Sequence, residues 1–217
     1  YLEGPQVSTE SMMIDGNCYT VGFSDRNYEY LEKYAPFIIE NGGDLPSSLP
    51  EEIKDEVKKV VQKAALSMGI VNGIVKGDIV IHDGKPYVIE LAARLSGGYF
   101  CTHEIPMSTG VDLVGNAIKM AIGEKVELHD LKPKFNKNIC QRYIFPKQGI
   151  IKEINGLHEL ENYSSIKYFN IHAKPGQEIE KTIAHPSRSG MVIATGNSRE
   201  DAKSNTKTAI ETIKFTY

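Results

Sequence analysis

Two segments near the N-terminus, 12–15 and 18–23, are rich in residues that favour strands, and they flank Gly16-Asn17. Two such runs around a Gly/Asn pair are typical of a β-hairpin. A second pair of apolar runs extends from Asp78 to Glu90, with Asp83-Gly84 between them. Asp-Gly is a strong hairpin signal, so the sequence predicts a second hairpin there.

Helical periodicity follows residue 50. Ser48-Leu-Pro-Glu51 has the pattern of a capping box, and Gly69 is a stop signal. One apolar stripe joins the two, made of Ile53, Val57, Val60, Val61, Ala64 and Met68. The preceding segment 24–50 contains Gly42-Gly43 and three prolines, and it is expected to be a loop.

The second half of the chain mixes helices with short strands. Thr109-Gly-Val-Asp112 is expected to cap a helix that ends near Gly123, and Ser198-Arg-Glu-Asp201 is expected to cap a last helix. That last helix should bury Ala202, Ala209, Ile210 and Ile213. Strands are expected at 139–145, 166–171 and 191–194. No strict βαβ rhythm is present, so the pattern predicts an α+β fold with an antiparallel sheet.

Composition adds few constraints. The chain has 217 residues and a formal net charge of -3, which gives no reason to propose nucleic acid or an anionic membrane as a partner. No apolar run approaches the roughly 18 residues of a membrane span. Its three cysteines, Cys18, Cys101 and Cys140, lack metal-ligand spacing. They favour reduced thiols and a cytoplasmic protein.

The candidate chemistry lies at the second hairpin. Glu90 ends an apolar strand, Arg94 follows four residues later, and the turn Ser96-Gly97-Gly98 comes next. Asp78 lies twelve residues upstream of Glu90. Carboxylate oxygens suit Mg²⁺, and an arginine can neutralise the charge of a phosphoryl group in transfer. This pattern favours a magnesium–phosphate site, with a plain hairpin carrying surface acids as the alternative.

The register of the hairpin separates these interpretations. A three-residue loop, Asp83-Gly84-Lys85, would place Asp78 directly opposite Glu90, so that both side chains project from one face of the sheet. A two-residue turn would place Asp78 opposite Ile89 and point Glu90 to the other face. The metal site requires that Asp78 face Glu90.

At these residues a family resemblance appears. The segment Val71 to Val126 resembles the C-terminal half of the ATP-grasp fold of ATP-dependent carboxylate–amine ligases, whose relatives include biotin carboxylase and the carbamoyl-phosphate synthase large subunit. Gly110-Val-Asp-Leu113 matches the helix start after the metal loop. From Ile139 onward the chain resembles the small β-rich domain of the biotin carboxylase branch. The resemblance implies an ATP-grasp half at 1–130 and a small C-terminal α+β domain at 131–217.

The N-terminal segment Tyr1-Leu2-Glu3-Gly4-Pro5 resembles the family segment that leaves the adenine-binding hinge. Because the chain begins inside this motif, we expect a fragment of a longer ligase, and we expect the isolated fragment to be inactive.

The resemblance implies a role for each site residue. Asp78 and Glu90 would bind the metal, and Arg94 and Arg142 would be catalytic. Cofactor-binding residues would be Tyr1, Leu2, Glu3, Glu10 and Arg26. The substrate-binding candidates are Ser96, Gly97 and Gly98, whose backbone N–H groups could donate to an oxyanion, together with Glu104 and Arg188. For Arg26 and Arg188 a surface arginine is the alternative, and for Ser96 to Gly98 it is a simple turn. Cys101 and His103 invite a thiol-nucleophile interpretation, but a packed histidine is favoured.

The implied reaction is an ATP- and Mg²⁺-dependent ligation of a carboxylate to an amine through an acyl phosphate, with Mn²⁺ as an alternative ion. The implied partners are ATP and small carboxylate and amine substrates, and a homodimer is left open. One departure stands out: many ATP-grasp enzymes have Asn two residues after the metal glutamate, where this chain has Ala92. Three alternatives therefore stay open: a non-catalytic nucleotide-binding module, an enzyme using bicarbonate or a nucleotide precursor, and a purely structural module.

Overall fold

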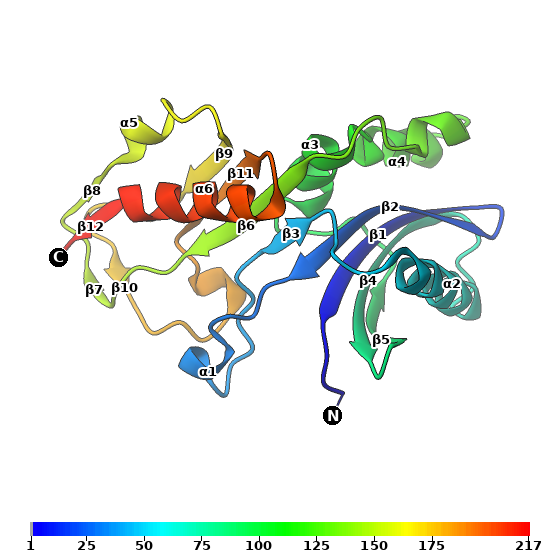
Figure 1. Cartoon of the computed structure of the whole chain (residues 1–217), viewed down its shortest axis with the longest axis horizontal. Coiled ribbons are helices and arrows are strands. Elements are labelled where there is room, and N and C mark those ends of the chain that lie inside the picture. Colours follow the sequence, from blue (N-terminus) through cyan, green and yellow to red (C-terminus); the bar gives the residue numbers. More distant parts are fainter. Residues whose placement is uncertain (1) are drawn as a thin grey trace. The chain divides into compact units, whose positions relative to one another are not determined.

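The structure, a computed structural model, describes residues 2–217, and it divides into two compact units. Unit 1 comprises residues up to Arg26 together with Leu45–Lys137, and unit 2 comprises Asn27–Asp44 and Asn138–Tyr217. Figure 1 labels their elements. The prediction of an α+β fold built on antiparallel sheet is confirmed. The linear division into 1–130 and 131–217 stays a prediction.

Unit 1 is an antiparallel sheet with the strand order β5-β4-β1-β2. Its strands are β1 (Gln6–Ile14), β2 (Asn17–Arg26), β4 (Gly73–His82) and β5 (Lys85–Ala92). Its helices are α2 (Glu51–Ser67), α3 (Ile105–Thr109) and α4 (Leu113–Ala121), with a π-helix at Phe100–Glu104 and a 3₁₀ turn at Leu128–Leu131.

The two faces of this sheet differ in polarity and in what packs against them. One face packs on helix α2 (Figure 1), and their shared core consists of Val7, Met13, Val57, Val61, Ala65, Val75, Ile79 and Ile81. The other face carries polar side chains and meets the segment of the π-helix and α3. An added Cβ at Gly22 would lie 2.5 Å from the Ile105 side chain, so this glycine lets α3 approach the strands closely.

Unit 2 has the strand order β3-β6-β11-β9, from β3 (Gly43–Leu45), β6 (Asn138–Ile144), β11 (Gly190–Gly196) and β9 (Ile166–Ile171). Helix α6 (Arg199–Thr212) packs along β6 and β11 (Figure 1). Short elements complete the unit: α1 (Leu31–Tyr34), α5 (Leu157–Leu160), a 3₁₀ turn (His185–Ser187), β7 (Gly149–Ile150) paired with β10 (Glu178–Ile179), and β8 (Glu153–Asn155) paired with β12 (Lys214–Thr216).

Two predicted helix starts are confirmed by their caps. The Asp112 side chain accepts a hydrogen bond from the Gly115 N–H at the start of α4, and the Ser198 side chain accepts one from the Asp201 N–H at the start of α6. A side-chain acceptor at this position satisfies a backbone donor that has no partner within the helix. Across residues 2–217, no helix is both long and apolar enough to cross a membrane.

The predicted capping box of α2 was wrong. Pro50 occupies the N-cap position and offers no side-chain cap. The Ser48 hydroxyl instead donates to Asp25 Oδ2 at 2.7 Å. The hydroxyl that was expected to cap the helix is therefore bonded to a residue distant in the sequence. Met68, expected in the apolar stripe, is 56% exposed.

Two other local predictions need correction. The first hairpin turns at Asp15-Gly16, with φ of 48° and 80°, because Ile14 pairs with Asn17. The segment 24–50 is not a loop throughout: β2 continues to Arg26, and the segment also contains α1 and β3.

Candidate functional site

The candidate metal residues Asp78 and Glu90 face each other across β4 and β5. The predicted three-residue loop was wrong, because His82 pairs with Lys85 around a two-residue turn, Asp83-Gly84. A β-bulge restores the required register: Ile79 pairs with Val88, Ile89 is left unpaired, and Asp78 then pairs with Glu90. The bulge adds one residue to β5 and brings both acids to the same face.

Strand pairing arranges the polar face in two rows. Ser8 of β1 pairs with Asp78, which pairs with Glu90. In the next row Glu10 pairs with Lys76, which pairs with Ala92. Opposed residues share a face, and so do residues two apart on one strand. The sheet therefore presents Lys76, Asp78 and Glu90 together.

Asp78 is buried among cationic and polar partners. Its Oδ2 lies 2.7 Å from Arg26 Nη1 and also contacts Lys76 Nζ, and its Oδ1 accepts a hydrogen bond of 2.9 Å from the Ser8 hydroxyl. Burial alone would raise the pKa of Asp78, but Arg26, Lys76 and Ser8 together lower it below its ordinary value. Asp78 is thus an anion at neutral pH, which a metal ligand must be.

Glu90 is the solvent-exposed acid of the pair. Its side chain is 58% exposed, and its Oε1 lies 3.8 Å from Lys76 Nζ. Lys76 itself is mostly buried and contacts both acids. Ligands arriving from solvent can reach Glu90, whereas Asp78 is enclosed by its partners.

Glu10 holds the loop that follows β5. Both its carboxylate oxygens accept from the Ser96 N–H, at 3.0 and 3.2 Å, and Oε2 also contacts the Ser96 hydroxyl. Burial raises the pKa of Glu10 to about 7, although the hydrogen bonds from Ser96 and the charges of Lys76 and Arg94 oppose the rise. Glu10 therefore fastens the loop to the sheet, and the Ser96 N–H expected to contact substrate is already engaged.

The rest of this loop is more exposed. Arg94 lies at the surface, and its Nη1 donates to the Leu95 carbonyl oxygen at 3.1 Å. Gly97 has open space where a Cβ would stand, and Gly98 has a φ of 64°. Glu104 is buried at the end of the π-helix.

Cys101 and His103 lie in the same π-helix. The Cys101 thiol donates to the Ser96 carbonyl oxygen at 2.9 Å, and burial raises its pKa. Because the reactive form of cysteine is the thiolate, Cys101 is poorly suited to act as a nucleophile.

The N-terminal candidates are only partly visible. Tyr1 lies outside the described residues. Leu2 is 41% exposed, and the Glu3 carbonyl oxygen lies 2.8 Å from His82 Nδ1, at the end of the metal hairpin.

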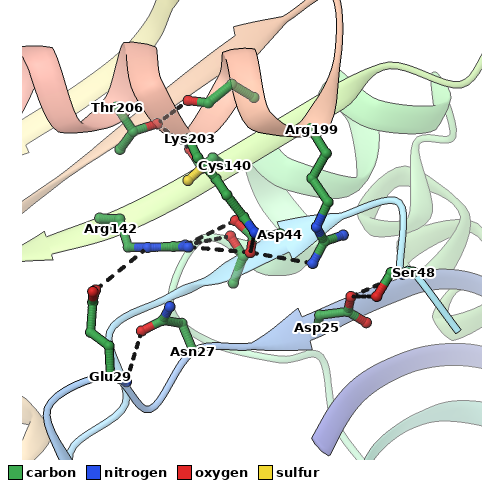
Figure 2. A network of polar contacts seen from close by, with 12 residues as sticks. Asp25, Asn27, Glu29, Asp44, Ser48, Cys140, Arg142, Arg199, Lys203 and Thr206 are labelled. Atoms are coloured by element: carbon green, nitrogen blue, oxygen red, sulfur yellow. Dashed lines mark hydrogen bonds and ion pairs between the residues drawn. The ribbon is translucent and has the colours of Figure 1, made fainter. Parts of the chain in front are cut away.

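Unit 2 contains a second ionic cluster, centred on Asp44 and shown in Figure 2. Asp44 is 4% exposed, and Arg142, Arg199 and Lys203 converge on it. The distances to its oxygens are 3.0 Å from Arg142 Nη1, 3.3 Å from Arg199 Nη2 and 3.7 Å from Lys203 Nζ. Arg142 Nε also lies 3.8 Å from Glu29 Oε1. Arg142, the predicted catalytic residue, is thus held firmly within this unit.

A cavity of ≈ 550 Å³ adjoins this cluster. Arg142, Lys203 and Glu29 line it, together with the aromatic rings of Tyr30 and Phe145. It combines cationic groups with apolar surface, as pockets for small anionic molecules do.

Arg188 is buried in another part of unit 2. Its guanidinium lies 3.7 Å from the centroid of the Tyr143 ring, and its Nη2 donates to the Glu40 carbonyl oxygen. These contacts hold the side chain in place, and its role toward a substrate stays a prediction.

Several members of both clusters were not predicted from the sequence. Lys76 has the clearest signal in retrospect, because it lies two residues before Asp78 on a strand and must share its face. Asp44 lies more than 150 residues before its partners Arg199 and Lys203, so no local pattern connects them.

The residues present fit one divalent cation. Asp78 and Glu90 supply hard anionic oxygens on one face, and Glu90 is open to solvent. In residues 2–217 no three His, Cys, Asp or Glu side chains form a metal-binding group. Mg²⁺ held by one or two carboxylates completes its shell with substrate phosphates and water, so two protein ligands are sufficient.

Solved structures define the class of fold. The chain is similar along its whole length to the L-amino acid ligase of Bacillus licheniformis, with a TM-score of 0.86 and 22% identity, and it covers 55% of that chain. It is also similar to phosphoribosylglycinamide synthetase of Anaerococcus prevotii (TM-score 0.83, 21% identity, 100% of this chain and 54% of that one). Biotin carboxylase of Campylobacter jejuni has a TM-score of 0.72 and 17% identity over 100% of this chain and 47% of that one. The fold is that of the C-terminal portion of ATP-grasp proteins, and the chain spans about half the length of these relatives.

The sequence comparisons are more specific. Residues 142–217 match the family described as L-amino acid ligase C-terminal domain 2. A protein of Sinorhizobium fredii named uncharacterized protein y4rH is 28% identical over 130 residues, which are 60% of this chain and 27% of that protein. The predicted resemblance to ATP-grasp carboxylate–amine ligases is confirmed.

Proposed function

We propose that this chain carries the metal-binding portion of an ATP- and Mg²⁺-dependent carboxylate–amine ligase that acts through an acyl phosphate. The observation that carries the proposal is the pairing of Asp78 with Glu90 on one sheet face, beside Arg26 and Lys76. The fold shared with ligases and the match of residues 142–217 to an L-amino acid ligase domain support it.

The chemistry needs positioning and charge neutralisation more than a protein nucleophile. A substrate carboxylate oxygen attacks the γ-phosphorus of ATP, the bond to the bridging oxygen breaks, and ADP leaves. The amine nitrogen then attacks the acyl carbon, the bond from carbon to the phosphate oxygen breaks, and the amine loses a proton. Arg94 would stabilise the phosphoryl group in transfer. Asp78 and Glu90 would hold Mg²⁺, which when bound neutralises charge on the nucleotide phosphates.

The sequence match supports a proposal for the substrates. L-Amino acid ligase gives its name to the family that matches residues 142–217, so we propose one amino acid as carboxylate donor and a second as amine. The cavity beside Arg142 offers cationic groups that suit a carboxylate.

Trapping of the acyl phosphate tests this function. The full protein would be incubated with Mg²⁺, ATP, single amino acids and hydroxylamine, which converts an acyl phosphate into a hydroxamate. We expect ADP and hydroxamate in equal amounts. Asp78→Asn and Glu90→Gln should each lower the rate by roughly 100-fold or more, because a metal ligand that neutralises developing charge is lost.

Asp83→Asn is the matched control. Asp83 lies on the same hairpin but is 90% exposed at its turn, so its substitution should leave the rate near normal. Equal loss in all three variants, or no hydroxamate with any of the amino acids, would contradict the proposed ligase.

Two observations favour a second candidate, a non-catalytic nucleotide-binding module. Ala92 provides no metal ligand, and Asp78 already has Arg26, Lys76 and Ser8 as partners. This candidate expects Mg²⁺-dependent binding of ATP without any ADP release. An enzyme that uses bicarbonate would instead release ADP only when bicarbonate is present.

We also propose that the protein works in a reducing compartment. Cys18, Cys101 and Cys140 are all free thiols, which is consistent with a reducing compartment such as the cytoplasm. Small molecules are the proposed partners, together with a second copy of the protein in a homodimer.

A further inference from the structure

Lys76 lies on the polar face, and the proposed reaction does not yet give it a role. Its ammonium contacts Asp78 Oδ2 and lies 3.8 Å from Glu90 Oε1, and its side chain is only 13% exposed. A lysine so largely buried must be paired to remain charged. Here its partners are the two carboxylates that would bind the metal.

The strand register explains why this lysine can lie there. Lys76 pairs with Ala92 across β4 and β5, on the same face as Asp78 and Glu90. Alanine is too short to reach the acids and offers no oxygen. The small residue leaves space beside Glu90, and the lysine stem opposite it extends toward the carboxylates.

The charges around Asp78 and Glu90 are already balanced. Arg26 and Lys76 bring two positive charges to these two carboxylates. A single Mg²⁺ with the phosphates of a nucleotide can join such a site. A second divalent ion would need a further oxygen ligand, and the Ala92 side chain provides none.

We propose that Lys76 is a built-in cation of this site, whose ammonium takes the place of a second divalent ion beside a single one held by Asp78 and Glu90. This rests on the proposed function, because it assumes that metal and nucleotide bind here. It assigns Lys76 a direct contact with the nucleotide phosphates, as a point charge that needs no coordination geometry.

Counting bound Mn²⁺ tests the proposal without measuring turnover. Mn²⁺ would be titrated into the full protein saturated with a non-hydrolysable ATP analogue, and free Mn²⁺ would be followed by electron paramagnetic resonance. We expect one Mn²⁺ per bound nucleotide in the unaltered protein. The double variant Lys76→Met with Ala92→Asn removes the ammonium and supplies an amide oxygen, so it should bind two.

Single variants complete the set. Lys76→Met alone should weaken nucleotide binding by at least about tenfold, in keeping with the loss of one charge-assisted hydrogen bond. Lys76→Arg keeps the charge and should keep the count at one. Lys85→Met is the matched control, because Lys85 is an exposed lysine on the same hairpin, and it should change neither the count nor the affinity.

Three outcomes would overturn the proposal. Two Mn²⁺ per nucleotide in the unaltered protein would show that Lys76 replaces nothing. Tighter Mn²⁺ binding in Lys76→Met, at an unchanged count of one, would show that the lysine only competes with the metal. Failure of the unaltered protein to bind nucleotide with Mn²⁺ would contradict the proposed function itself and is thereby distinguishable. Circular dichroism of each variant confirms that it is folded.

Discussion

Asp78 in unit 1 and Asp44 in unit 2 are both buried carboxylates surrounded by cations, yet their surroundings differ. Asp78 shares its partner Lys76 with Glu90, which is 58% exposed, so its cluster opens to solvent through a second acid. Asp44 is the shared partner of Arg142, Arg199 and Lys203. The first cluster has an accessible anion for a metal, whereas the second has an excess of positive charge gathered on one enclosed carboxylate.

We infer from this difference that the Asp78 cluster can exchange ions, whereas Asp44 itself has a structural role. A buried carboxylate with several cations costs desolvation that only complete pairing offsets. Around Asp44 the three cations would lose the carboxylate that they share if Asp44 were replaced. Around Asp78, Lys76 would still have Glu90.

The largest expected effect is on stability. Asp44→Ala should lower the free energy of unfolding by about 3–5 kcal/mol, because it leaves the mostly buried Arg142 and Arg199 without their common anion. Asp78→Ala should cost clearly less. Urea denaturation of both variants measures the difference, and equal losses would break the comparison between the clusters.

Arg94 should affect catalysis rather than stability. Its side chain is exposed, so Arg94→Ala should leave thermal denaturation nearly unchanged. If it contacts the phosphoryl group in transfer, kcat should fall by roughly 100-fold or more, equivalent to about 2.7–4 kcal/mol. Arg94→Lys should recover only part of the rate, since an ammonium does not reproduce a planar fork. Near-normal turnover in the alanine variant would remove Arg94 from the mechanism.

Glu10 should make stability depend on pH. Its pKa in the folded protein is about 7, against an ordinary 4.5, so the folded state binds the proton more tightly than the unfolded state. Stability is therefore greatest below about pH 4.5 for this group and falls as pH rises to about 7, by about 3 kcal/mol. The groups facing it are Lys76, Arg94 and Cys101.

The measurement is urea denaturation between pH 4.5 and 7.5, with Glu10→Gln as the variant that cannot titrate. The slope over this range should disappear in Glu10→Gln. Asp78 contributes the opposite slope in a separate window: its pKa is lowered, so its stabilisation is lost only as the pH falls below about 3.8. An unchanged slope in Glu10→Gln would show that another group titrates there.

The smallest effect concerns Lys203, the outermost cation of the Asp44 cluster. Its side chain is 42% exposed and its Nζ lies 3.7 Å from Asp44 Oδ2. Lys203→Ala should cost about 0.2–1 kcal/mol, and the cost should shrink in high salt. Arg199→Ala is the comparison, because that side chain is only 19% exposed and should cost more.

The features that were predicted correctly from the sequence depend on interactions between residues close together in the chain. The Asp83-Gly84 hairpin, the cap at Asp112 and the cap at Ser198 all follow from residues within a few positions of each other. The facing of Asp78 and Glu90 was predicted for the wrong reason, because a bulge at Ile89 and not a longer loop sets it. No residue type in this strand indicates a bulge, so the bulge could be recognised only from the pairing of β4 with β5.

Contacts between residues distant in the sequence explain the other features that were predicted wrongly or not at all. Asp25 takes the hydroxyl of Ser48, which made the predicted capping box fail. The strand β3 has three residues and is too short to have a period. Asp44 has its partners far away in the sequence, so its cluster could not be inferred from spacing.

The bulge at Ile89 also bears on self-association. Strand β5 ends the strand order of unit 1, and Tyr87, Val88 and Ile89 on it are exposed by 41%, 37% and 54%. A regular apolar edge offers an even row of donors and acceptors to a strand from another copy, and an irregular one does not. Deletion of Ile89 would keep Asp78 opposite Glu90, since Glu90 would then follow Val88 directly. The extra residue is thus dispensable for pairing the acids, and it makes the outer strand of unit 1 irregular, which is a poor template for a further strand.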